Sequence, residues 1–414
     1  MHEPSHSSDA SSPPTVELNA LLRAAVDRGA SDVHLKFGQP PVIRFDGDLQ
    51  VLEGWPPFDS LVLETVVRQV VGNAPSRLAA FEDTGELDTA YQQKDLPRFR
   101  INIFRQRGEI SLACRVIPRE VPDFETLRLP RGVARLAEEH RGLILVTGAT
   151  GAGKTTTLAA VIGHINRTRK QHIVTIEDPI EILHADLGCI VNQREVGIDT
   201  NSFHEALRRV LRQDPDVILI GELRDAETAE TALQAAESGH LVLSTMHTVD
   251  ASETVSRLVE FFPAIKQPQV RSILAGVLRG VVSQRLLPRA GGGRIAAVEV
   301  MVANNRIAEL IRENKPEYIP EAIAEGAFFD MQTLSAALID RVLAGDVERE
   351  VAANAAPNKH DFEIALERAL KEQTVASAAA AAAEEDADAD APPQVLTVPA
   401  ASQAPDPAGS LRLA

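Results

Sequence analysis

The segment Gly148-Ala-Thr-Gly-Ala-Gly-Lys-Thr155 fits the pattern G-x-x-x-x-G-K-[ST] in full. The apolar run Leu143–Thr147 leads into this segment, and helix-forming residues lead out of it. Glycines allow the backbone to wrap around phosphate groups, and the helix that follows adds positive potential. The alternative, an ordinary glycine-rich turn, is disfavoured by the Gly-Lys-Thr ending. The sequence therefore predicts a nucleotide site formed by Gly148, Ala149, Thr150, Gly151, Ala152, Gly153, Lys154, Thr155 and Thr156.

Two side chains of this loop have predicted roles in the site. Lys154 would contact the β and γ phosphates of the nucleotide, and Thr155 would hold Mg²⁺. The expected ligands are therefore ATP and Mg²⁺.

Polar side chains also follow three further apolar runs. These are Glu177 after His172–Ile176, Glu222 after Val217–Ile220, and His247 after Leu241–Thr245. Continuous apolar runs of this kind are typical of a parallel sheet covered on both faces. Because ligands bind beyond the carboxyl ends of such strands, we expect these side chains to gather at the edge that carries the phosphate loop.

Hydrolysis requires a group that orients or deprotonates the attacking water. Glu222 is the first candidate for this role and Glu177 the second, and either could reach Mg²⁺ through water. The alternative for each is a solvated carboxylate at a strand end. His247 would sense the γ-phosphate or connect the site to the next helix, although a lone histidine at a strand end is more often structural.

Residues 15–120 predict a small α+β domain that follows a disordered leader, residues 1–14. Two helices and four strands are expected in it without a βαβ rhythm: Val16–Arg28, Leu61–Val71, Val33–Phe37, Val42–Phe45, Phe99–Phe104 and Ile110–Ile117. Asp46-Gly47 is a hairpin turn pattern. Arg98, Arg100, Arg105, Arg107 and Arg115 gather on one predicted hairpin and its partner strand, and they are either solvated or available to neutralise phosphate charge.

The remaining chain divides into four parts. A linker with Pro122 and Pro130, residues 121–132, precedes an α/β ATPase domain, residues 133–303. A helical region follows at residues 304–373, and a disordered tail rich in alanine, proline and acidic residues occupies 374–414.

Composition excludes several classes of protein. The net charge of −17 opposes an extended nucleic-acid surface, and no apolar run is long enough to span a bilayer. The two cysteines, Cys114 and Cys189, form no CxxC pair and are expected in the core. The polar N-terminus lacks the pattern of a secretory signal, so a cytoplasmic location is predicted.

Several segments resemble those of the PilT-type retraction ATPases of bacterial type IV pili, within the secretion-ATPase superfamily. They are Gly29–Leu35, Pro41–Gly47, Thr175–Glu181, Val191–Val196, Asp214–Asp225 and Gly239–Thr248. The third resembles the family's Asp box, the fifth its Walker B segment and the last its His box. The resemblance covers residues 20–343.

The resemblance implies a PAS-like domain at 15–120, a RecA-like motor domain at 133–303 and a homohexamer. It implies ATP bound between the two domains, with the site completed by a neighbouring subunit. Arg100 and Arg115 match positions that offer arginines to the γ-phosphate, and His247 matches the His box.

Retraction is favoured over its relatives by two features. The four-cysteine zinc module typical of pilus assembly and type II secretion ATPases is absent from the sequence. The stretch Arg306–Glu313 resembles a retraction-motor helix, with departures at Arg306, Ala308 and Glu309. The PilT and PilU branches fit equally, and the acidic tail belongs to neither.

The implied partners are an inner-membrane pilus platform protein and a paralogous pilus ATPase, with the motor on the inner face of the cytoplasmic membrane. Three alternatives stay open: an assembly or type II secretion ATPase, an ATP-regulated binding module with little turnover, and a nucleic-acid translocase.

Overall fold

The computed structural model describes residues 17–45, 47–72, 75–117 and 121–389. The predicted leader at 1–14, Asp46 of the predicted turn and residues 390–414 of the predicted tail therefore lie outside the described residues. Residues 17–357 form one compact unit, and the chain from Asn358 onward forms a second.

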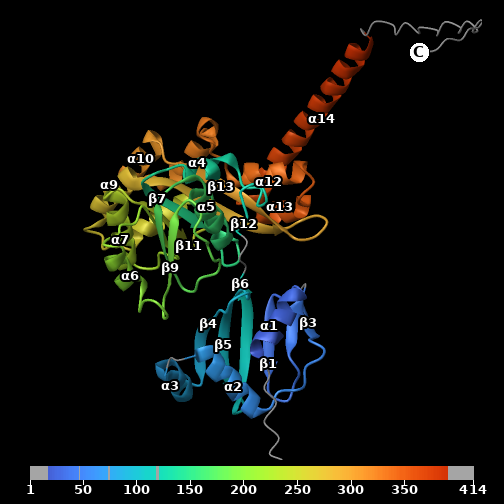
Figure 1. The fold of residues 1–414 in the computed structure, drawn as a ribbon. Coiled ribbons are helices and arrows are strands. Elements are labelled where there is room, and N and C mark those ends of the chain that lie inside the picture. The colour runs from blue at the N-terminus through green and yellow to red at the C-terminus, as the bar shows by residue number, and fades with distance from the viewer. Residues whose placement is uncertain (1–16, 46, 73–74, 118–120, 390–414) are drawn as a thin grey trace, which may run out of the picture. The chain divides into compact units, whose positions relative to one another are not determined.

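The first part of the chain forms an antiparallel sheet in the order β3-β2-β1-β6-β5-β4 (Figure 1). Its strands are β1 (Asp32–Lys36), β2 (Val42–Phe45), β3 (Asp48–Val51), β4 (Glu86–Tyr91), β5 (Arg98–Gln106) and β6 (Glu109–Ile117). The helices are α1 (Leu18–Asp27), α2 (Ser60–Val71) and α3 (Pro75–Thr84). Four of these strands and two of these helices were predicted within two residues of their observed ends.

Alternation along β5 explains how this sheet buries one face. On β5, Phe99, Ile101 and Ile103 are buried, while Arg100 between them is exposed. Apolar side chains of α1 and α2 join the same core, including Leu21, Leu22 and Leu63. Period-two burial against helices is the arrangement expected for a sheet with one wet face.

The second sheet has seven strands in the order β13-β12-β7-β11-β10-β8-β9 (Figure 1). Its strands are β7 (Gly142–Thr147), β8 (His172–Glu177), β9 (Ile190–Glu195), β10 (Val217–Ile220), β11 (Leu241–Met246), β12 (Leu278–Pro288) and β13 (Arg294–Val302). All neighbouring pairs are parallel except β12 and β13. The predicted parallel sheet and its four predicted strands are confirmed.

One helix precedes β7, and the others lie in connections between later strands of this sheet. They are α4 (Arg131–Ala137), α5 (Lys154–Thr168), α6 (Phe203–Val210), α7 (Ala226–Glu237), α8 (Ala251–Glu260) and α9 (Gln267–Val277). Every residue of β7, β10 and β11 is buried, which is why these strands are continuously apolar in sequence. Asp225 and Asp250 cap α7 and α8 by accepting hydrogen bonds from the backbone N–H groups of Thr228 and Glu253.

The predicted helical region consists of α10 (Asn305–Arg312), η1 (Pro316–Tyr318), α11 (Ile319–Ala324), η2 (Ala327–Phe329), α12 (Leu334–Leu343) and α13 (Arg349–Ala355). The linker is attached to this region, because Arg128 donates to Asp346 Oδ1 at 2.6 Å. Arg289 donates to the same oxygen at 3.1 Å. Asp346 therefore fixes the linker to the C-terminal helices.

α14 (Lys359–Ala389) belongs to the second unit. It continues beyond residue 373, where the sequence analysis ends the helical region, because alanine has the highest helix propensity. Among the described residues, no helix combines the length and apolarity that a membrane span requires. Cys114 and Cys189 are buried free thiols, as predicted, and burial raises the pKa of Cys114 to about 12.

Candidate nucleotide site

The phosphate loop connects β7 to α5 with three glycines in backbone conformations that L side chains rarely adopt. Gly148 has φ of 143°, Gly151 of 78° and Gly153 of 87°. Gly153 also caps α5, so that Lys154 and Thr155 are its first two residues. The loop therefore precedes a helix N-terminus, where backbone N–H groups lack partners within the helix.

Lys154 is the central cation of this loop. Its Nζ donates to Gly148 O at 2.8 Å and to Ala149 O at 3.1 Å, and it lies 3.4 Å from His247 Nδ1. Burial lowers the pKa of Lys154, while the charges of Glu222 and Glu181 act in the opposite direction. The ammonium group is thus held over the loop by carbonyls and is available to a phosphate.

Glu222 follows β10 and is held by the side chains of Arg224 and His247. Arg224 Nη2 lies 2.8 Å from Glu222 Oε2, and His247 Nε2 lies 3.2 Å from Glu222 Oε1. Burial by itself would raise the pKa of Glu222, but the Arg224 hydrogen bond and the His247 charge lower it overall. Lys154, His247 and Glu222 therefore form a continuous polar chain at the ends of β10 and β11.

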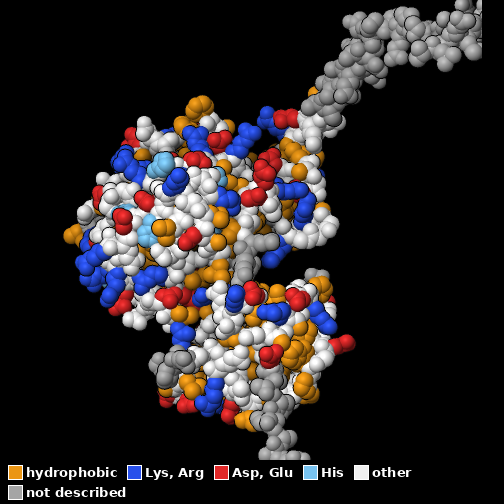
Figure 2. Space-filling model, in the orientation of Figure 1, with side chains coloured by type: hydrophobic (Ala, Val, Ile, Leu, Met, Phe, Trp, Pro, Cys, Tyr) orange, Lys and Arg blue, Asp and Glu red, His pale blue; other side chains and the backbone are white. Residues whose placement is uncertain are grey.

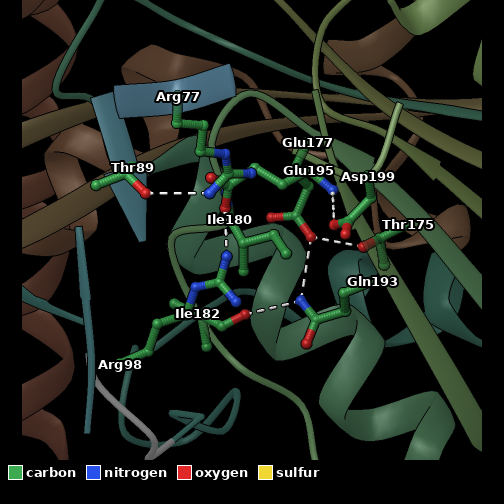
Figure 3. A network of polar contacts seen from close by, with 10 residues as sticks. All are labelled: Arg77, Thr89, Arg98, Thr175, Glu177, Ile180, Ile182, Gln193, Glu195 and Asp199. Carbon is green, nitrogen blue, oxygen red and sulfur yellow. Dashed lines mark hydrogen bonds and ion pairs between the residues drawn. The ribbon is translucent and has the colours of Figure 1, made fainter. Parts of the chain in front are cut away.

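Glu177 at the end of β8 is held differently (Figure 3). Its Oε1 accepts hydrogen bonds from Thr175 Oγ1 at 2.6 Å and from Gln193 Nε2 at 3.1 Å. The residue is only 7% exposed, and this burial raises the pKa of its carboxyl. Glu177 therefore has one oxygen committed to protein partners.

Glu181 is a residue that the sequence analysis quoted but did not propose for the site. It lines the same cavity as Lys154 and Glu222, and its charge favours the protonated form of Lys154. Its place four residues after Glu177, in the segment that resembles the Asp box, was the available clue. The direction of its side chain could not be read from the sequence.

A cavity of about 620 Å³ unites these groups. The lining includes Thr150, Gly151, Ala152, Gly153, Lys154, Thr155 and Thr156 of the loop, with Glu177, Glu222 and His247 from the strand ends. Arg115 also lines it and is bound to Asp32 at 2.9 Å. Both Arg115 and Arg100 are exposed, but Arg100 is not part of the lining. The predicted gathering of strand-end residues around the loop is therefore observed.

The loop between β8 and β9 is braced by Glu195 (Figure 3). Glu195 Oε2 accepts from the backbone N–H of Ile180 at 3.2 Å and from Arg98 Nη2 at 2.7 Å. Ile180 directly precedes Glu181. An arginine of β5 therefore contacts, through Glu195, the loop that carries a carboxylate of the cavity.

Comparison with known proteins identifies the family. A family model described as type II/IV secretion system protein matches residues 7–292. The chain belongs to this family. The type IV pilus retraction ATPase PilT of Pseudomonas aeruginosa is 42% identical over 347 residues, which are 84% of this chain and 100% of that protein. The type IV pilus ATPase PilU of the same organism is 38% identical over 352 residues, which are 85% of this chain and 91% of that protein.

A solved structure gives the same assignment to the secretion ATPase family. The crystal structure of the pilus retraction motor PilT with bound ADP aligns with a TM-score of 0.78 at 43% identity. The alignment covers 84% of this chain and 99% of that chain. The α/β fold predicted from the sequence is therefore the fold of a known nucleotide-binding motor of this family.

Proposed function

We propose that this secretion ATPase hydrolyses ATP to drive retraction of a type IV pilus, the movement that produces twitching motility. The observation that carries the proposal is the polar chain in which Lys154, 2.8 Å from Gly148 O, lies 3.4 Å from His247. His247 lies in turn 3.2 Å from Glu222. The side chains of a lysine, a histidine and a glutamate therefore lie in contact with one another at one phosphate loop. The similarity to PilT over the whole length of that protein supports the same function.

ATP binding is assigned to the residues of the loop. The backbone N–H groups of Gly148–Thr156 would hold the phosphates, and Lys154 would contact the β and γ phosphates. Thr155, the second residue of α5, lines the cavity together with Glu177 and Glu222, so the donor set suits a hard cation with oxygen ligands. Mg²⁺ at this position would neutralise charge on the phosphates, with Glu177 or Glu222 reaching it through water.

Glu222 is the residue that we assign to orienting the attacking water. Its lowered pKa keeps the carboxylate ionised, and its contact with His247 fixes one oxygen. Glu177 is the second candidate, although the hydrogen bonds from Thr175 and Gln193 occupy its Oε1. His247 joins Glu222 to Lys154 and would respond to the γ-phosphate.

Arg100 and Arg115 are proposed to neutralise charge that develops on the γ-phosphate. Arg115 lines the cavity of its own chain, which supports this role. Arg100 is exposed on β5 and opposite Arg115 in the sheet, so it is the arginine that a neighbouring subunit would use. One arginine from the same chain and one from a neighbouring subunit fit a homohexamer with ATP bound between two domains.

Finer statements about the fold, the location in the cell and the partners belong to the same proposal. The second sheet and its helices form a RecA-like motor domain, and the first sheet forms a PAS-like domain. The motor acts in the cytoplasm, at the inner face of the cytoplasmic membrane, on a pilus platform protein and beside a paralogous pilus ATPase. On the face drawn in Figure 2, side chains of both charge signs are interspersed, which supports a protein partner rather than nucleic acid.

A deletion strain tests the direction of the motor. Loss of a retraction motor predicts excess surface pili without twitching, and restoration by the wild-type chain but not by Lys154→Ala. Bald cells would instead assign the chain to pilus assembly. Restoration of twitching by Glu222→Ala, a variant that should bind ATP without turning it over, would favour an ATP-regulated binding module.

A further inference from the structure

Ser283 and Gln284 on β12 contact the start of the phosphate loop. Thr147, the last residue of β7, donates from its Oγ1 to Ser283 Oγ at 2.9 Å. A Cβ atom on Gly148 would lie 2.4 Å from Gln284 O, so the backbone of β12 is packed directly against the first loop residue. The start of the loop is therefore fixed to β12.

The side chain of Gln284 contacts the other end of the same loop. Its Nε2 donates to Ala152 O at 2.5 Å, and its Oε1 accepts from Thr157 Oγ1 at 2.9 Å. Ala152 is two residues before Lys154, and Thr157 lies in the first turn of α5. One amide thus joins the end of the loop to the start of the helix.

The chemistry of this contact suits an amide. Gln284 is 2% exposed and Thr157 is also 2% exposed, so neither has water as an alternative partner. Asparagine and glutamine are the uncharged side chains that place a donor and an acceptor on one rigid group. An apolar replacement would leave both Ala152 O and the Thr157 hydroxyl without this partner in a buried place.

We propose that Gln284 is a positioning residue for nucleotide binding. By holding Ala152 O, it fixes the orientation of the Ala152–Gly153 peptide, and with it the N–H groups directed at the phosphates. Gln284 acts through the loop and not by touching the reacting atoms. This inference rests on the proposed ATP site, and it adds a residue from β12, a strand to which the sequence analysis assigned no role.

The first test replaces Gln284 with methionine, which preserves length but has neither amide group. We expect the affinity for ATP and for ADP to fall at least about tenfold, the loss expected when a buried hydrogen-bonding group is left unmet. The loss should appear in KM, with a smaller change in kcat, because Glu222 and His247 are untouched. Gln332→Met is the matched control, since Gln332 Nε2 donates to Val298 O at 2.7 Å away from the loop. The control should keep the wild-type KM.

The second test uses Gln284→Glu and pH. An ionised carboxylate cannot donate to Ala152 O and repels it, whereas a protonated carboxyl can donate. Burial raises the pKa of a carboxyl, so nucleotide affinity relative to wild type at the same pH should recover as pH falls from about 8 to about 6. Gln284→Met should show no such recovery. If Gln284 served only packing, nucleotide affinity of Gln284→Glu should not recover at low pH either.

The outcomes separate the two proposals. If wild type binds nucleotide and both Gln284 variants bind it equally well, or if the loss in Gln284→Glu is independent of pH, the positioning role is wrong. If wild type itself binds no nucleotide in the same titration, the proposed function fails. Thermal unfolding without nucleotide shows whether each variant folds, and should Gln284→Met not fold, Thr157→Val removes only the hydroxyl donor and must weaken binding.

Discussion

Glu299 is a buried carboxyl on β13 that lies against the first residue of α8. It is 8% exposed and accepts a hydrogen bond from the backbone N–H of Ala251 at 2.9 Å. Burial raises the pKa of this carboxyl from 4.5 to about 7, and Asp250 adds to the effect. The folded protein therefore holds a proton on Glu299 that the unfolded chain releases at lower pH.

The sign of the resulting pH dependence follows from that raised pKa. The stability that Glu299 contributes is present below pH 4.5 and is lost as pH rises through about 7. Glu299→Gln keeps an acceptor for Ala251 and cannot ionise. We expect the free energy of unfolding of the variant, relative to wild type, to increase between about pH 5 and pH 8 by up to about 3 kcal/mol. Denaturant titrations across this range measure it, and an equal difference at every pH would contradict it.

Residues at strand ends could be predicted from the sequence, and side-chain directions could not. Lys154 was predicted from the phosphate-loop pattern, and Glu222 and His247 because a parallel sheet brings its carboxyl ends to one edge. The partners of Glu177, and the places of Glu181, Arg224 and Gln284, depend on rotamers and on contacts between distant segments. Arg115 was proposed from resemblance and lines the cavity, whereas Arg100 is exposed and does not.

At the scale of elements, the phosphate loop depends on the close approach of β12. Gly148 has φ of 143°, and a Cβ there would meet Gln284 O at 2.4 Å. Gly151 has φ of 78°, but a Cβ there would meet nothing within 4 Å. The two glycines therefore differ in their surroundings although both have positive φ.

This contrast gives a matched pair of variants. Gly148→Ala should displace the loop from β12 and weaken ATP binding by at least about tenfold, since backbone cannot yield as a flexible side chain can. Gly151→Ala should cost the strain of its φ, about 1 kcal/mol of stability, and should weaken ATP binding less than Gly148→Ala. Nucleotide titration and thermal unfolding of both variants measure the effects. Equal affinities in the two variants would show that the contact with β12 does not shape the loop.

Two features account for the strands of the second sheet that could not be predicted from the sequence. β12 follows α9 with no intervening turn, because α9 ends at Val277 and β12 begins at Leu278, and β13 is its antiparallel partner at the edge of the sheet. β9 lies at the other edge of this sheet and contains the polar residues Asn192, Gln193 and Arg194. The central strands β7, β10 and β11 lie between other strands and are continuously apolar, so their pattern alone identified them.

At the scale of the whole molecule, the ion pair of Arg98 with Glu195 joins β5 of the first sheet to the loop that carries Glu181. Their atoms Nη2 and Oε2 are 2.7 Å apart, and the two side chains are 16% and 8% exposed. Glu195 also accepts from Ile180 N–H. Removing Arg98 would leave the Glu195 carboxylate without its cationic partner and with little access to solvent, beside the loop that carries Glu181.

A double-mutant cycle tests this coupling. We expect Arg98→Ala and Glu195→Gln each to lower stability and kcat, with a coupling energy of about 1–3 kcal/mol in the free energy of unfolding. Arg105→Ala is the control, because Arg105 lies on the same strand over the ring of Phe81 and away from Glu195. Purely additive effects of the Arg98 and Glu195 changes would contradict the coupling.

The central claim is that the ends of β10 and β11 and the phosphate loop together cleave ATP. The most direct test measures phosphate release by wild type and by Glu222→Gln, each at a saturating ATP concentration. Since Gln cannot act as a base and loses the charge that holds His247, we expect turnover to fall at least about a hundredfold while ATP binding is retained. Turnover equal to that of wild type would contradict the account.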